Sequence, residues 1–322
     1  MRHFLFATFL VVLLALPASS SAQNRVALLT DINGTVEVAR AGSQSFAPAE
    51  WGTQLFEGDR IRTAENARTA LLFANGNMLS LEGNASMTVS ASSIASPALS
   101  GPVRELDGEL LAVASDVMLH RAGEGEIAVL GGLRNAPSSE ALQAAYPVNT
   151  LIPNAVPTFS WTAVDGFDLY TIKVQSAGTT IWSGATDASE LQYPATAPAL
   201  VSGVSYYWQV EAEDMLDVVS SPLYSFEVAD DETAASVEAN RARIQSMFHG
   251  QTESSEFWYV LGTYYAGQDL LGDAVIAFNR IATQHPQSAS VHRILGRLYS
   301  QTGQKDAAIQ ALQKAVSLSQ KD

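Results

Sequence analysis

The chain has 322 residues, which at roughly 100–200 residues per domain allows two or three domains. Hydrophobic residues make up 47% and charged residues 16%, a balance that supports folded cores and excludes a chain disordered throughout. The formal net charge of −15 repels phosphate backbones and anionic lipid surfaces, so we expect no nucleic-acid partner.

The sequence contains no cysteine. Disulfides, thiol catalysis and cysteine metal sites are therefore excluded. A lipoprotein anchor, which needs an N-terminal cysteine, is excluded as well.

The N-terminus has the pattern of a secretory signal. Arg2 precedes an apolar run over residues 4–16, and Pro17 ends that run. The run is shorter than the roughly 20 residues that a membrane-spanning helix needs. We expect cleavage after Ala22 and a periplasmic or secreted protein without stable membrane insertion; an uncleaved anchor is the alternative.

Residues 23–133 are predicted to form a β module, because short β-branched runs alternate there with glycine, asparagine and aspartate. The clearest feature is a hairpin in which residues 69–73 and 78–81 flank Asn75-Gly76, a pair that tolerates the positive φ angles of a tight turn. Further strands are predicted at residues 34–40, 60–63, 87–90, 109–114 and 126–130.

Short motifs follow one another in this module. In order they are Gly34-Thr35-Val36, Leu55, Gly58-Asp59-Arg60-Ile61-Arg62-Thr63, Ala70-Leu71-Leu72-Phe73, Asn75-Gly76 and Leu79-Ser80-Leu81. This set, over residues 32–89, resembles the FecR-type domain family. The resemblance implies a β fold and an envelope location. Family members that regulate sigma factors carry a cytoplasmic segment before a membrane helix; we expect none here, and so no ferric-citrate signalling.

Asp59 in the Gly58-Asp59 turn is predicted to cap backbone amides, which is a structural role. Residues 134–150, with Pro137 and Pro147, are predicted to be a linker.

Residues 151–229 are predicted to form a β-sandwich, because aromatic and apolar residues alternate in several short runs separated by turn residues. Trp161 and the spacing Leu200-x-x-Gly203-x-x-Tyr206 resemble a fibronectin type III or related immunoglobulin-like domain. The resemblance implies a tyrosine corner, in which the Tyr206 hydroxyl bonds a nearby backbone group. We expect the tryptophans at 161, 182 and 208 to serve packing rather than a carbohydrate platform, with Trp182 the most exposed.

The segment 230–250 is predicted to connect the sandwich to the C-terminus through a helix. Asp230, Asp231 and Glu232 suit a helix N-terminus, through capping and the macrodipole, so the helix is expected over residues 233–248.

Residues 251–322 contain an internal repeat. Residues 255–288 align with residues 289–322, a shift of about 34 residues that is the period of tetratricopeptide repeats. The matched core positions are Trp258, Leu261, Gly262, Tyr265, Ala274 and Phe278 in the first unit, and Leu295, Gly296, Tyr299, Ala308 and Leu312 in the second, where His292 stands at the position of Trp258.

These units resemble two tetratricopeptide repeats, helical hairpins whose small residues let the paired helices approach. The resemblance implies a concave groove lined by Tyr259, Thr263, Arg293 and Arg297. Arg293 and Arg297 share one helix face and are suited to clamp a carboxylate of a partner protein; a solvated basic face is the alternative.

Two repeats are fewer than the roughly three that a stable stack needs. We therefore expect Ile309, Leu312 and Val316 to be partly open on an uncapped final helix. The helix over 233–248 is expected to cover one end of the array. A partner protein, a second copy or the protein's own β modules is expected to cover the other.

No catalytic motif of a metalloprotease, serine hydrolase or nucleotide-binding site occurs in the sequence. Glu105, Asp107 and Glu109 alternate and are suited to bind calcium or to act as acid and base, but a solvated strand face is the expected role. We therefore expect no cofactor, no metal and no enzymatic activity.

The predicted fold class is multidomain: an all-β FecR-like module, a β-sandwich and all-α helical hairpins. The function expected first is that of an exported envelope scaffold for protein–protein interaction. The alternative is a FecR-like periplasmic component of an envelope or iron-responsive signalling system. A cell-wall hydrolase is a third class, and it lacks any supporting motif.

Overall fold

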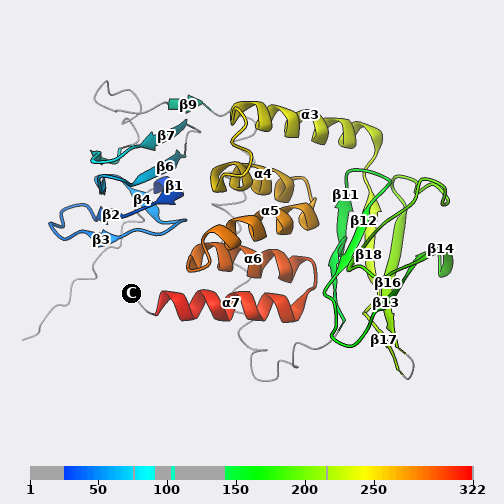
Figure 1. Ribbon diagram of the computed structural model, residues 1–322. Coiled ribbons are helices and arrows are strands. Elements are labelled where there is room, and N and C mark those ends of the chain that lie inside the picture. Colours follow the sequence, from blue (N-terminus) through cyan, green and yellow to red (C-terminus); the bar gives the residue numbers. More distant parts are fainter. Residues whose placement is uncertain (1–24, 75–76, 91–102, 106–141, 215–216, 321–322) are drawn as a thin grey trace, which may run out of the picture.

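The computed structural model describes residues 25–74, 77–90, 103–105, 142–214 and 217–320. Two β modules and a set of C-terminal helices make up this part of the chain, and the helices lie between the two modules (Figure 1). The multidomain fold class predicted from the sequence is confirmed.

The N-terminal module packs two sheets against each other. Its strands are β1 (Arg25–Asn33), β2 (Val36–Ala39), β3 (Ala47–Pro48), β4 (Gln54–Phe56), β5 (Arg60–Thr63), β6 (Arg68–Phe73), β7 (Asn77–Leu81), β8 (Ser86–Thr88) and β9 (Val103–Glu105). The sheet orders are β4-β1-β6-β7-β9 and β3-β2-β5-β8. Leu29, Leu55, Ile61 and Leu71 are fully buried in the core of the module.

Two local predictions in this module are confirmed. Strands β6 and β7 pair antiparallel, with Leu72 opposite Met78, while the predicted turn at Asn75-Gly76 lies outside the described residues. Asp59 is buried at its turn, where its carboxylate accepts hydrogen bonds from the amides of Ala41 at 3.0 Å and Phe56 at 3.1 Å. The predicted strands at 109–114 and 126–130 lie outside the described residues.

The second module is a β-sandwich. Its strands are β10 (Ala144–Tyr146), β11 (Thr150–Ile152), β12 (Thr158–Trp161), β13 (Leu169–Ser176), β14 (Thr179–Thr186), β15 (Glu190–Gln192), β16 (Ser205–Glu213), β17 (Val218–Ser220) and β18 (Tyr224–Val228). One sheet has the order β10-β12-β15 and the other β11-β18-β16-β13-β14, with β17 beside β16. The side chains of Phe159, Trp208 and Phe226 pack together between them.

The tyrosine corner is present, since the amide of Val201 donates to the Tyr206 hydroxyl at 2.7 Å. Trp182 is the least buried of the three sandwich tryptophans, and its ring lies 5.0 Å from that of Tyr193. It therefore takes part in packing.

The linker predicted over 134–150 is wrong from residue 142 onward. Strand β10 belongs to the sandwich, and Leu142 and Val148 are only 1% exposed in its core. The carbonyl oxygen of Pro147 accepts the buried indole N–H of Trp208 at 2.6 Å, which ties this stretch to the core. The remainder of the predicted linker lies outside the described residues.

The helices are α3 (Asp231–Met247), α4 (Ser255–Gly267), α5 (Leu271–Gln284), α6 (Ala289–Gln301) and α7 (Lys305–Ser319). The predicted connecting helix is confirmed as α3, capped by Asp230, whose carboxylate accepts from the Thr233 amide at 2.7 Å. Helices α4–α5 and α6–α7 form two hairpins, with Asp269 and Gly303 in the left-handed conformation at the turns.

Glycine at the helix crossings is needed for close packing. A Cβ added to Gly262 would lie 3.0 Å from Phe278, and one added to Gly296 would lie 2.6 Å from Leu312. The two contacts are equivalent under the repeat, as the sequence predicts.

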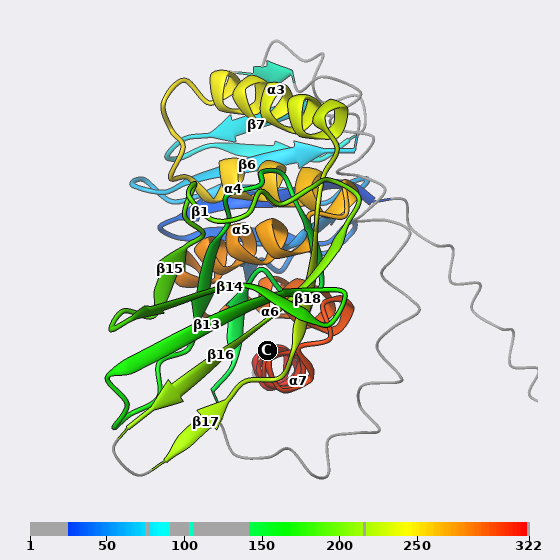
Figure 2. The same cartoon turned by 90° about the vertical axis from the view of Figure 1, so that its right-hand side faces the viewer.

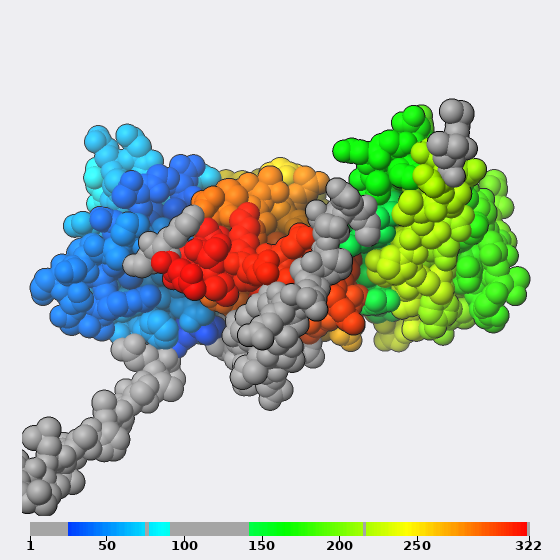
Figure 3. Space-filling model, turned by 90° about the horizontal axis from the view of Figure 1, so that it is seen from below, coloured from blue at the N-terminus to red at the C-terminus, as the bar shows by residue number. Residues whose placement is uncertain are grey.

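Seen from below, the N-terminal module, the helices and the sandwich form a row (Figure 3). From the sandwich side, its strands lie across the ends of the helices (Figure 2). The helical array therefore has a β module on each of two sides. On its last helix, Ile309 and Leu312 are partly buried and Val316 is 46% exposed.

Candidate functional site

The groove positions predicted from the repeat come together in space. Tyr259 and Thr263 on α4, and Arg293 and Arg297 on α6, line one cavity. Tyr259 and Thr263 are 0% and 1% exposed, because the N-terminal module covers this side of the array. In this arrangement a separate protein does not reach the side chains of Tyr259 and Thr263. Their proposed role in binding a separate protein stays a prediction.

Trp51 occupies the groove. It lies in the loop between β3 and β4 and is 2% exposed. Its ring centroid is 5.7 Å from that of Tyr259, edge to face, and 6.2 Å from that of His285, stacked. Its indole N–H donates to the carbonyl oxygen of Thr30 at 2.9 Å, so both the apolar ring and the polar edge are satisfied.

Serines at the starts of α4 and α6 hold the backbone of the module. The Ser288 hydroxyl donates to the Trp51 carbonyl at 2.7 Å, and the Ser255 hydroxyl donates to the Thr30 carbonyl at 2.9 Å. Gly52 has a φ of +82°, and an added Cβ would lie 2.5 Å from the Ser290 Cβ. The approach of loop and helix thus requires glycine at this position.

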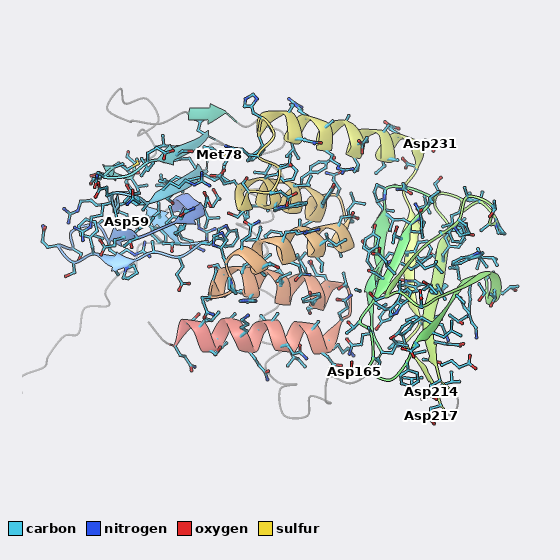
Figure 4. The ribbon with its side chains drawn as sticks, in the orientation of Figure 1. Asp59, Met78, Asp165, Asp214, Asp217 and Asp231 are labelled. Carbon is cyan, nitrogen blue, oxygen red and sulfur yellow. The ribbon has the colours of Figure 1, made fainter. Side chains whose placement is uncertain are left out.

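The contact extends beyond Trp51. Leu28, Leu72 and Met78 point away from the interior of the N-terminal module and join the same hydrophobic cluster as the helices. Met78 lies on the side of the module that faces α3 and α4 (Figure 4). The module and the array therefore share one continuous core.

The sandwich meets the array at helix ends. Helix α5 has no side-chain cap of its own, and the amide of Gly272 donates to the Thr150 hydroxyl at 2.9 Å. The Tyr146 hydroxyl donates to the Asp273 carboxylate at 3.2 Å, and the Asn149 side chain donates to the Thr302 carbonyl at 2.7 Å. The sandwich supplies the partners that helix termini lack.

Burial changes the titration of two groups at these contacts. It raises the pKa of Asp273 to about 6, although the hydrogen bond from Tyr146 and the charge of Arg241 act in the opposite direction. It lowers the pKa of His285, against a smaller effect of Asp31. The Nε2 atom of His285 is buried without a hydrogen-bond partner in the described part of the chain.

A cleft of about 880 Å³ opens between the sandwich, α3 and the first hairpin. Trp258 lines it, with a buried indole N–H that lacks a partner among the described residues. The Arg280 guanidinium lies 5.8 Å from the Trp258 ring, and Ile276 is 42% exposed at the cleft. Charges of both signs line the same cleft, from Glu190, Glu238, Glu253, Asp273 and Arg241.

Sequence reasoning missed Trp51, and no repeat or alternation marks it. Of the alternating acidic residues, Glu105 falls in β9, while Asp107 and Glu109 lie outside the described residues. Within the described ranges, no group of three or more His, Cys, Asp and Glu side chains is placed to hold a metal ion. None of the helices placed there combines the length and apolar character needed to cross a membrane.

Comparison with known proteins identifies one repeat. A family model described as "Tetratricopeptide repeat" matches residues 292–322, which cover most of α6 and all of α7. No curated protein matches the chain.

Solved structures give weaker likenesses. One named "Cell surface anchoring domain" shares 20% sequence identity at a TM-score of 0.20, over 20% of this chain and 86% of that chain. One named "Structure of FN3tt mut" shares 18% identity at a TM-score of 0.20, over 27% of this chain and 92% of that chain.

Proposed function

We propose that this protein is a non-enzymatic, exported envelope scaffold whose helical array holds two β modules and binds a further protein. The observation that carries the proposal is that one surface of the array is filled from within the chain and a second is open. Its groove is filled by Trp51 of its own N-terminal module, and a second, larger cleft stays open beside Trp258. Tetratricopeptide arrays commonly bind protein segments on such surfaces.

The open cleft has the chemistry of a protein-binding surface. Exposed Ile276 and the ring of Trp258 supply apolar contact, and the unpaired indole N–H needs an acceptor. A backbone carbonyl of a bound segment would supply that acceptor. Glu190, Glu238 and Arg241 around the cleft would then select the charge pattern of the partner.

Crosslinking capture from the envelope tests this surface. Ile276→Asp places a charge in the cleft, and we expect it to lose partners that the wild-type protein captures. Val218→Asp is the matched control, because Val218 is 61% exposed on β17, away from the cleft. Figure 4 shows the neighbouring Asp214 and Asp217 at the far end of the sandwich. Equal capture by both variants would contradict the proposal.

Export is a separate part of the proposal, supported by the signal-like pattern before Gln23. We expect the protein in the periplasmic or secreted fraction with Gln23 as its first residue. N-terminal sequencing of the purified protein checks this. A chain that keeps Arg2 and sediments with membranes would favour the uncleaved anchor.

A FecR-like signalling role is the second candidate. The Gly58-Asp59 turn and the β6–β7 hairpin, whose motifs carry that resemblance, favour it. Transcript profiling of a deletion strain separates the two functions. Loss of a sigma-factor-dependent gene set in the deletion strain, together with equal capture of partners by the wild-type protein and Ile276→Asp, would favour signalling.

A further inference from the structure

A cavity of about 120 Å³ lies beside Trp51, between the N-terminal module and the groove. This is space for about four water molecules, well below the roughly 300–1,000 Å³ of pockets for drug-sized ligands. A protein segment does not fit such a volume. A small ion or molecule does.

Among the described residues that line this cavity, the charged side chains all have one sign. Arg25 reaches it from β1, and Arg293 and Arg297 reach it from α6. Among the described residues that line it, none is an aspartate or a glutamate. Three guanidinium groups thus surround one small space in a protein whose formal net charge is −15.

Two donors at the cavity have no acceptor in the part of the chain that the structure describes. Tyr259 is 0% exposed, and its hydroxyl has no hydrogen-bond partner within the described residues. The Nε atom of Arg25 is also buried there without one. Arg25 lies close enough that its charge partly offsets the rise that burial causes in the pKa of Tyr259. An unsatisfied buried donor costs about 1–3 kcal/mol, so an acceptor in the cavity would be stabilising.

We propose that this cavity binds one small oxyanion, a phosphate or a carboxylate, between the guanidinium groups of Arg25, Arg293 and Arg297 and the hydroxyl of Tyr259. Arginine only donates hydrogen bonds, and its planar fork fits both kinds of anion. Arg25 belongs to the N-terminal module and the other three groups to the array. The bound anion therefore ties the module to the array.

Calorimetric titration of the full-length protein with inorganic phosphate, and separately with acetate, tests the proposal. Both titrations are done at constant ionic strength set with chloride. We expect one of the two anions to bind and to raise the melting temperature. Tyr259→Phe and Arg25→Gln should each weaken that binding about tenfold, the loss of one charge-assisted hydrogen bond.

Tyr259→Phe also keeps the proposal testable if Arg25→Gln fails to fold. It removes only the unpaired hydroxyl, so the anion-free variant should melt at or above the wild-type temperature. Tyr299→Phe and Arg280→Gln are the controls: the Tyr299 hydroxyl pairs with Asn279, and neither residue lines the cavity. Both should bind like wild type. Binding of neither anion, or full affinity retained in Tyr259→Phe, would overturn the proposal.

Discussion

Trp51 connects parts of the molecule that lie far apart in the sequence. Its carbonyl accepts a hydrogen bond from Ser288 at the start of α6, 237 residues further along the chain. Its ring packs against Tyr259 of α4 and against His285 at the end of α5. A large aromatic ring buried at the centre of a contact commonly carries a large share of its binding free energy. The same is expected here for the contact between module and array.

Trp51→Ala should open that contact. Removing a fully buried aromatic side chain costs about 3–5 kcal/mol, from lost apolar burial and from the cavity left behind. We expect faster hydrogen exchange in α4 and α6, while the sandwich is unchanged. Phe46→Ala is the control, because the centroid of the Phe46 ring lies 4.1 Å from the Arg62 guanidinium, on a different part of the module. Equal effects of the two substitutions on hydrogen exchange in α4 and α6 would show that Trp51 does not stabilise the contact between the module and the array.

The distance between partners decides which residues the sequence reveals. Asp59 and Tyr206 are predictable, because Phe56 and Val201 lie only three and five residues away. Short sequence motifs therefore predict both of these local hydrogen bonds. Trp51 and Thr150 have partners more than a hundred residues distant, and no local pattern records such a contact.

The start of helix α5 shows how one element depends on another. Its N-cap, Leu270, offers no side-chain acceptor, and Thr150 of the sandwich takes that role for the Gly272 amide. Thr150→Val keeps the shape and removes the hydroxyl, so we expect the first turn of α5 to lose about 1–2 kcal/mol of local stability. Exchange of the Gly272 amide measures it. Thr158→Val, at an exposed site on β12, should leave it unchanged.

Gly296 fixes the spacing of the last hairpin. Alanine there would gain about 1 kcal/mol in helix propensity, but its Cβ would lie 2.6 Å from the Leu312 side chain. We expect Gly296→Ala to destabilise α6 and α7 by about 1–3 kcal/mol in denaturant unfolding, because the packed helices must separate. Adding Leu312→Ala should recover part of the loss. An additive double variant would contradict this steric explanation.

Within the whole molecule, the array has two contacts that should respond to acid in opposite directions. His285 stacks on Trp51 at the module contact, and its pKa is lowered below 6.5. Its contribution to stability is complete above pH 6.5 and is lost as the pH falls, because protonation charges a partly buried ring whose buried Nε2 atom has no acceptor among the described residues. A lower pH therefore weakens the contact between the helical array and the N-terminal module.

The contribution of Asp273 to the sandwich contact depends on pH in the opposite direction. Its pKa rises from 3.8 to about 6, so the folded protein binds this proton more tightly than the unfolded chain does. Its contribution is complete below pH 3.8 and is lost as the pH rises through about 6. Moving from pH 7 to pH 5 should therefore strengthen the sandwich contact by about 1 kcal/mol.

Hydrogen exchange at pH 7 and pH 5, corrected for the intrinsic effect of pH, can resolve both contacts in one experiment. In wild type we expect protection to fall in α4 and α6 and to rise at the start of α5, while the amide of Val210 in the sandwich core is constant. His285→Phe keeps an aromatic ring against Trp51 and should abolish only the first change. Asp273→Asn cannot ionise and should abolish only the second, because the two groups act on different faces of the array. If either variant removed both changes, a single global transition would explain the pH response instead.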